Sequence, residues 1–337
     1  MLVAVTFRDL PMPSVDLILN PRARHLGEES EVRKALLDAA REVGAVVHET
    51  GELIELDSAA RSIAARGSTA VILAGGDGSY MAGVTALVRA FGDRATPPIA
   101  LAPGGTVGTV ARNWGGARSG SAAARAANVV RRAARGGETV RRPTLRVSDD
   151  RGRDHVGFML GAGLVAGFFD EYYAAPAQGY ATAAKIVARV FVESFAPERG
   201  ARARSLASRV LEPVPAKLVV DGAEAAPERW SLVLASVIRD VGLHMLVTPR
   251  AGETPGAFHV VASPLGPREL GPQMPRVLAG RRLRGEGHVD VPAARELTIR
   301  FGAANEPEER AYVLDGDVLR AREVRVSAGP SVEVLRL

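Results

Sequence analysis

The stretch Ala70-Val71-Ile72-Leu73-Ala74-Gly75-Gly76-Asp77-Gly78-Ser79 decides how the first half of the chain folds. Its apolar part predicts a buried strand, its glycines predict a turn, and the following residues Tyr80 to Ala90 predict a helix. Glycines reach backbone angles that a Cβ forbids, and the start of a helix offers free N–H groups and the positive end of its dipole. A strand, a glycine turn and a helix start therefore indicate a phosphate-binding site.

Two interpretations of Asp77 follow from this turn. A carboxylate cannot itself bind a phosphate, so Asp77 either holds Mg²⁺ or orients a nucleotide, or it only caps the helix together with Ser79. A glycine turn without a ligand is the simpler alternative, because short motifs of this kind also occur in ordinary turns.

Strands and helices alternate through the first half of the chain. Predicted strands cover residues 15–19, 45–48, 70–73 and 98–101, and predicted helices cover residues 30–43, 58–65, 80–90, 107–113 and 119–134. This alternation predicts an α/β domain with a parallel sheet, in which ligands gather at the carboxyl ends of the strands. The loops that contain Asn20, Thr50, Gly75 and Gly104 should therefore line one crevice.

The pattern changes beyond residue 140, where short β-type runs dominate. They cover residues 144–147, 155–160, 217–220, 230–237, 244–247, 258–261, 289–291, 297–301, 311–314, 324–326 and 332–335. One long helix is predicted at residues 180–195, and Asp221-Gly222 and Asp315-Gly316 predict hairpin turns. Alternation of apolar and polar residues in these runs predicts a β-sandwich.

These patterns predict four segments. They are an extension at residues 1–14, an α/β domain at 15–138, a β-sandwich domain at 139–320, and C-terminal strands at 321–337 that we expect to pack back on the first domain. The motifs described below imply that the α/β domain binds nucleotide and that the β-sandwich domain binds a lipid or another substrate.

Composition limits the chemistry that the chain can perform. The 337 residues include no cysteine, which excludes disulfides and thiolate metal sites. A net charge of +5 suits an acidic partner such as a nucleotide, an anionic lipid surface or nucleic acid, although a solvated surface is the better explanation for most of these arginines. The longest apolar run, Val156 to Phe169, is too short and too rich in glycine to span a bilayer. We expect a cytoplasmic protein without a signal peptide.

Several short motifs follow one another in a distinctive order. They are Asn20-Pro21, Gly75-Gly76-Asp77-Gly78-Ser79, Pro103-Gly104-Gly105-Thr106 with Ala111-Arg112, Gly161-Ala162-Gly163, and Leu314-Asp315-Gly316-Asp317. Together they resemble the diacylglycerol kinase catalytic-domain family, which includes bacterial lipid kinases and sphingosine kinases. The resemblance extends from Asp16 to Leu335. It implies a first domain like those of NAD kinases and phosphofructokinases, a C-terminal β-sandwich domain, and an active site in the cleft between the two.

The resemblance also implies an activity and the residues that perform it. The activity is transfer of the γ-phosphate of ATP, with Mg²⁺, to a hydroxyl of a diacylglycerol- or sphingoid-type lipid. Asp317 takes the place of the catalytic base, with Asp315 as the alternative, and Asp77 helps to hold Mg²⁺. The implied nucleotide-binding residues are Asn20, Pro21, Arg22, Arg24, Thr50, Gly75, Gly76, Asp77, Gly78, Ser79, Tyr80, Met81, Gly105 and Thr106.

The implied partner is a lipid at the inner membrane face, reached by peripheral contact, without nucleic acid and without a transmembrane segment; a homodimer is left open. Three positions depart from the family pattern. Asp317 replaces a glutamate, Gly108 replaces an asparagine, and Pro255 stands where a structural Mg²⁺ site has an aspartate. Two alternatives therefore stay open, namely a kinase relative that only binds nucleotide or lipid, and a kinase of a soluble substrate.

Overall fold

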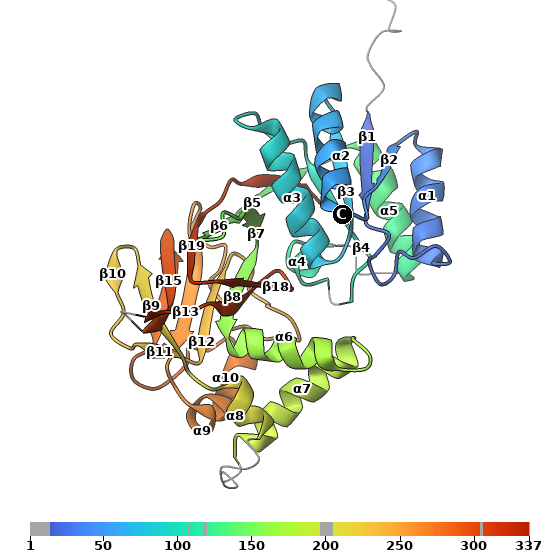
Figure 1. Cartoon of the computed structure of the whole chain (residues 1–337). Coiled ribbons are helices and arrows are strands. Elements are labelled where there is room, and N and C mark those ends of the chain that lie inside the picture. Colours follow the sequence, from blue (N-terminus) through green and yellow to red (C-terminus); the bar gives the residue numbers. More distant parts are fainter. Residues whose placement is uncertain (1–13, 107, 117–119, 196–204, 304–305, 337) are drawn as a thin grey trace, which may run out of the picture.

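The computed structural model describes residues 14–106, 108–116, 120–195, 205–303 and 306–336 (Figure 1). Predictions for residues 1–13, 107 and 119 lie outside this part. The first sheet has six strands in the order β2 (Val46–Glu49), β1 (Val15–Leu19), β3 (Ala70–Gly75), β4 (Ile99–Pro103), β20 (Val332–Leu335) and β5 (Thr139–Arg142). All neighbouring pairs are parallel except β20 with β5.

Helices cover both faces of this sheet. Apolar side chains of α1 (Glu31–Glu42) and α5 (Ala122–Arg135) pack on one face, and those of α2 (Leu53–Arg66) and α3 (Asp77–Phe91) pack on the other. The short helix α4 (Thr109–Asn113) follows β4. Because both faces are covered, the central strands are buried along their whole length, as parallel strands usually are.

Local sequence explains where these helices begin. The Ser30 hydroxyl accepts hydrogen bonds from two N–H groups in the first turn of α1. Helix α2 begins five residues earlier than predicted, because the Glu55 carboxylate accepts hydrogen bonds from the N–H groups of Gly51 and Glu52. This is one half of a capping box, which the apolar pattern alone does not reveal.

Two antiparallel sheets form the second half. The larger sheet runs in the order β10 (Ala223–Glu224), β9 (Val214–Val220), β15 (Glu296–Ala303), β19 (Glu323–Ala328), β6 (Leu145–Asp149) and β7 (Asp154–Gly157), with β11 (Arg229–Trp230) on β9 and β16 (Glu306–Pro307) on β15. The smaller sheet runs in the order β14 (Val289–Ala294), β13 (Phe258–Ser263), β12 (Leu232–Ser236), β8 (Met159–Gly163), β17 (Arg310–Leu314) and β18 (Asp317–Ala321). The predicted fold class, a parallel α/β domain followed by antiparallel strands, is confirmed.

The second half also holds helices that the sequence patterns did not predict. The predicted helix is α7 (Tyr180–Glu193), and it is accompanied by α6 (Leu164–Ala174), α8 (Leu206–Val210), α9 (Pro267–Leu270), a 3₁₀ turn (Gly271–Gln273) and α10 (Met274–Leu278). The strand predicted at residues 244–247 was wrong. Leu243 and His244 have φ angles of 52° and 60°, which a strand does not allow, so this segment is a loop.

The predicted strand at residues 155–160 is two strands in different sheets. The chain leaves β7 at Gly157 and enters β8 at Met159, and the N–H groups of Phe158 and Met159 donate hydrogen bonds to the Asp315 carboxylate. The carboxylate of a residue 157 positions after Phe158 therefore accepts the hydrogen bonds of the backbone N–H groups where the chain passes from one sheet to the other. The local sequence pattern cannot show this contact.

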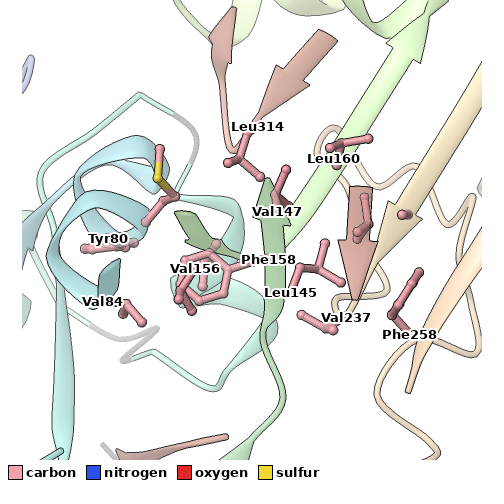
Figure 2. Packing of buried hydrophobic residues seen from close by; sticks show 14 of the residues in the cluster. Tyr80, Val84, Leu145, Val147, Val156, Phe158, Leu160, Val237, Phe258 and Leu314 are labelled. Atoms are coloured by element: carbon pink, nitrogen blue, oxygen red, sulfur yellow. The ribbon is translucent and has the colours of Figure 1, made fainter. Parts of the chain in front are cut away.

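A continuous apolar core joins α3 to the antiparallel sheets. Figure 2 shows Tyr80 and Val84 of α3 beside Val156 and Phe158. The Thr85 hydroxyl reinforces this contact, because it accepts a hydrogen bond from the Val156 N–H at 2.8 Å and donates one to the Val156 carbonyl at 3.2 Å. The first turn of α3 is thus held at a fixed place relative to the second half of the chain.

Candidate active site

The glycine turn forms a tight link between β3 and α3. Gly76 is the N-cap of α3 and provides no side-chain cap, so the first N–H groups of the helix, those of Asp77, Gly78 and Ser79, have no partner within the helix. The Gly75 carbonyl accepts hydrogen bonds from the N–H groups of Gly104 and Gly105, at 2.8 and 3.0 Å. A Cβ on Gly105 would lie 2.5 Å from the Gly76 Cα, so glycine is required here by close packing of two loops.

A small pocket of about 240 Å³ opens beside this turn. Four of the predicted nucleotide-binding residues line it, namely Asn20, Arg22, Thr50 and Ser79. The Asn20 amide donates a hydrogen bond to the Ser79 hydroxyl at 2.9 Å, and its oxygen accepts one from the Arg22 N–H. The structure therefore brings the carboxyl ends of β1, β2 and β3 together around one space.

Other predicted nucleotide-binding residues lie elsewhere. Tyr80 and Met81 are 0% and 3% exposed, and their side chains pack in the core, so neither side chain faces this pocket. Pro21 is half-buried in the turn after β1. The Arg24 guanidinium donates a hydrogen bond to the Gln178 carbonyl, between α6 and α7, and so connects the first loop to the second half of the chain.

Asp77 caps a neighbouring helix. Its two carboxylate oxygens accept hydrogen bonds from the N–H groups of Thr109 and Val110, each at 2.9 Å, in the first turn of α4. Burial raises the pKa of Asp77, and these two N–H groups oppose that rise. Both predicted roles, a Mg²⁺ ligand and a cap of its own helix, miss this contact, which fixes the start of α4 against the glycine turn.

Asp315 is a buried structural carboxylate. It is 3% exposed and forms a hairpin turn with Gly316, with φ angles of 49° and 99°, as predicted from the Asp-Gly pair. Its oxygens accept hydrogen bonds from the N–H groups of Phe158 and Met159, at 2.9 and 3.0 Å. Burial raises the pKa of Asp315 well above its ordinary value, and the negative charges of Asp77 and Asp317 add to the rise.

Asp317 is the available carboxylate of this group. It is the first residue of β18, and no described residue forms a hydrogen bond with its side chain. A Cβ on Gly78 would lie 3.0 Å from the Asp317 Oδ1, so the carboxylate lies against the first turn of α3. Surrounding protein raises the pKa of Asp317, although the side chain stays open to the adjoining cavity. The Tyr173 hydroxyl donates a hydrogen bond to the Gly316 carbonyl at 2.8 Å and so holds this hairpin.

A cavity of about 860 Å³ extends from Asp317 into the second half of the chain. Its polar end is lined by Arg22, Arg24, Asp77, Gly78, Thr106 and Asp317. The rest of its wall is mainly apolar and comes from α6, α7, β12 and α10, with Leu164, Phe168, Val187, Phe191, Leu234 and Val277 among its members. Figure 1 shows α6 and α7 beneath the small antiparallel sheet.

The predicted site did not include the cavity wall. From the sequence, core packing explains Phe168, Phe169, Tyr172 and Tyr173 at least as well as a lipid pocket does. The structure places all four on the cavity wall. The Phe168 and Tyr172 rings are stacked with centroids 5.9 Å apart, and the other neighbouring rings meet edge to face or tilted. Helical spacing of aromatic residues directly after Gly161-Ala162-Gly163 was the available signal.

The described residues contain no cluster of three or more histidine, aspartate or glutamate side chains placed to hold a metal ion. In the loop before Pro255, the Glu253 carboxylate forms ion pairs with Arg239 at 3.2 Å and with Arg250 at 3.1 Å. At the cavity, Asp317 has free carboxylate oxygens and Asp77 lies near it. These residues fit a Mg²⁺ ion that arrives with nucleotide phosphates and keeps several waters.

The first part of the chain is similar to a known family. Residues 14–139 match the family model of the diacylglycerol kinase catalytic domain. No curated protein matches the sequence. Among the helices of the described residues, none has the length and apolar character needed to cross a bilayer.

Three solved structures from Bacillus anthracis str. Sterne share the whole fold. One is described as a diacylglycerol kinase, with a TM-score of 0.59, 15% identity, and coverage of 96% of this chain and 97% of that one. Two are described as candidate diacylglycerol kinases, with TM-scores of 0.61 and 0.63 and identities of 16% and 14%. Each of these two matches covers 97% of this chain. The match covers 97% of the first of the two chains and 98% of the second. At these identities the likeness establishes the fold.

Proposed function

We propose that the chain is an ATP- and Mg²⁺-dependent kinase that phosphorylates a hydroxyl of a diacylglycerol- or sphingoid-type lipid. One observation carries the proposal. A single cavity joins the Asp317 carboxylate and the first turn of α3 to an apolar wall formed by α6, α7 and α10. A lipid offers a hydroxyl at one end and acyl chains at the other, and this cavity has the matching polarity.

The polar end suits phosphoryl transfer. In the proposed reaction the free N–H groups at the start of α3 bind the phosphates of ATP, and Thr106 donates a hydroxyl hydrogen bond to the nucleotide. The adjoining small pocket, with Thr50 and Asn20, accommodates the nucleoside. Such reactions depend on positioning and charge neutralisation more than on covalent catalysis by the protein.

Asp317 is the proposed base. As the lipid oxygen forms its bond to the γ-phosphorus, the bond from that phosphorus to the bridging oxygen of ADP breaks, and the hydroxyl proton passes to Asp317. Mg²⁺, when bound, neutralises charge that develops on the phosphates. Asp315 is not suited to this role, because both of its oxygens are buried on backbone N–H groups.

We also propose that the two halves of the chain bind different substrates. Residues 15–138 bind the nucleotide, residues 139–320 bind the lipid, and the chain then returns toward the first part. In the structure β5 and β20 pair with each other within the first sheet, and β19 lies in the larger antiparallel sheet. The substrate places the enzyme in peripheral contact with the inner face of the membrane, from the cytoplasm.

The second candidate function is binding of nucleotide or lipid without turnover. The carboxylates of Asp77 and Asp315 already accept hydrogen bonds from backbone N–H groups, which favours this second function. Of the three aspartates, Asp317 alone would then have to bind the metal ion and also accept the proton. A kinase of a soluble substrate is less well supported, because the apolar wall of the cavity would have no ligand.

The test is transfer of labelled phosphate from ATP, with Mg²⁺, to mixed micelles that contain diacylglycerol, monoacylglycerol, ceramide or sphingosine, with NAD as a soluble acceptor. Labelled lipid supports the proposal and identifies the acceptor. Labelled NAD alone would establish the soluble-substrate reading. Measurable ATP binding without any labelled product would favour the binding protein.

A further inference from the structure

The segment Met274–Arg284, which contains α10 and the turn after it, has two different sides. On the inner side Met274, Val277 and Leu283 line the large cavity. On the outer side Leu278 is 42% exposed, and Arg281 and Arg284 are exposed as well. One short segment therefore separates the apolar cavity from solvent and carries positive charge outward.

Three of the four arginines in this segment form no ion pair with a described residue. Within the described chain no ion pair involves Arg276, Arg281 or Arg284, whereas Arg282 pairs with Asp290 at 3.2 Å. The Arg276 guanidinium donates its hydrogen bonds, at 3.0 and 2.8 Å, to the Arg282 carbonyl. Desolvation and the neighbouring charges of Arg284 and Arg281 lower the pKa of Arg276, as expected for cations held close together. Such a cluster is complementary to an anionic surface.

Exposed apolar side chains lie on the element next to this segment. At the end of α7, Val192 is 66% exposed and Phe195 is 60% exposed. The Phe195 ring packs on Phe191, a cavity-lining residue, with centroids 5.1 Å apart. A Cβ on Gly271 would collide with the Ser194 hydroxyl, so the end of α7 touches the turn that leads into α10. Figure 1 shows α7, α8 and α10 together, on the side away from the parallel sheet.

We propose that Met274–Arg284 and residues 192–195, at the end of α7 and just after it, form the surface with which the protein docks on an anionic lipid bilayer, beside the apolar end of the cavity. The arginines bind lipid phosphates, and Leu278, Val192 and Phe195 enter the region between headgroups and acyl chains. Nucleic acid would satisfy the cations but would leave these apolar side chains in water. The role of the surface in delivering substrate rests on the proposed lipid kinase function, whereas its binding to membranes does not.

The test compares two triple variants of the full chain by co-sedimentation with vesicles, in the absence of ATP. The test variant is R276Q/R281Q/R284Q. The control variant is R61Q/R295Q/R322Q, which removes three exposed arginines that also have no ion pair within the described residues. The vesicles are phosphatidylcholine, with and without phosphatidylglycerol. Each arginine near an anionic surface changes affinity about fivefold, so the test variant should bind the anionic vesicles on the order of 100-fold more weakly.

The expected result is that wild type and control variant bind anionic vesicles alike and the test variant does not. Equal binding of the two variants would overturn the proposal, as would wild-type binding that does not depend on phosphatidylglycerol. Turnover of a water-soluble, short-chain diacylglycerol separates this inference from the proposed function. The test variant should retain that turnover. If the wild type binds vesicles but shows no turnover, the proposed kinase function is contradicted and the proposed docking surface is still supported.

Discussion

The Asp317 Oδ1 lies 3.0 Å from the position that a Cβ on Gly78 would occupy. A carboxylate from the last quarter of the chain thus meets the first turn of a helix from its first quarter. The contact depends on the core between α3 and β7, where Thr85 bonds to both backbone groups of Val156. Because Gly78 has no side chain, the space between Asp317 and the free N–H groups of α3 stays open to the cavity.

The first prediction concerns the hairpin turn at Asp315. Replacing Asp315 by Ala should lower the free energy of unfolding, because two buried N–H groups lose their acceptor at about 1–3 kcal/mol each. The control is D221A. Asp221 has the same φ angle of 49° and also accepts hydrogen bonds from two consecutive N–H groups, but in an exposed turn where water can replace it. Urea unfolding of both variants should show the larger loss for D315A, by at least about 2 kcal/mol; equal losses would contradict the structural role of Asp315.

The second prediction concerns Tyr173 as a positioning residue. Y173F removes the hydrogen bond from the hydroxyl to the Gly316 carbonyl and so loosens the hairpin that carries Asp317. We expect kcat to fall roughly 2- to 10-fold, the equivalent of one neutral hydrogen bond, while the KM for ATP stays unchanged. Y180F is the matched control, because Tyr180 is also half-exposed and its hydroxyl has no described partner. A higher KM for ATP with unchanged kcat would contradict this role, because it would show that Tyr173 affects ATP binding and not the position of Asp317.

The third prediction concerns the packing of the two glycine loops. G105A places a Cβ 2.5 Å from the Gly76 backbone, so the loops must separate. Overpacking of this kind costs about 1–3 kcal/mol, and we expect ATP to bind about tenfold or more weakly. G27A is the control, because a Cβ on Gly27 meets nothing within 4 Å. Calorimetric titration with ATP measures both, and equal affinities would show that the turn does not hold the phosphates.

The fourth prediction concerns pH. Burial raises the pKa of Asp317 above its ordinary value of 3.8, and a base must be ionised to act. Turnover should therefore fall as the pH falls through this raised pKa. The folded state holds this proton more tightly than the unfolded state does. The free energy of unfolding therefore falls as the pH rises from 3.8 to the raised pKa of the folded state, and below 3.8 Asp317 costs no stability.

The variant D317N removes that ionisation. It should be more stable than wild type at neutral pH, and the difference should vanish in acid. The same change at Asp170, which is exposed on α6, provides the control. Chemical unfolding at several pH values measures the effect, and a D317N advantage that is independent of pH would contradict it.

The sequence predicted the first half of the fold well, because the strands, turns and helices there are determined by short stretches of neighbouring residues. Apolar runs such as Ala70–Leu73 and the glycine turn after them define strand, turn and helix in turn, and the alternation of elements predicts the parallel sheet. In the second half, local patterns were less informative. The loop at Leu243 and His244 has the apolar content of a strand, and only the positive φ angles in the structure exclude one.

The roles of the aspartates depended on contacts between distant residues. Asp77 bonds to N–H groups at Thr109 and Val110, and Asp315 bonds to those at Phe158 and Met159, so neither role can be derived from the neighbouring sequence. Asp317 was predicted as the base from motif order, and its place beside Gly78 supports that proposal. The cavity required the fold itself, because its wall combines helices and a strand from across the second half.

The measurement that tests the central proposal most directly is phosphate transfer from ATP to micellar lipid by wild type, D317A and D170A, with the ATP affinity of each protein measured in parallel. Loss of a positioned base should lower turnover by D317A about 10²- to 10⁴-fold. ATP affinity should stay unchanged, because the N–H groups of α3 remain in place. D170A should behave like wild type. Turnover by D317A at the wild-type rate would contradict the role of Asp317 and with it the proposed active site.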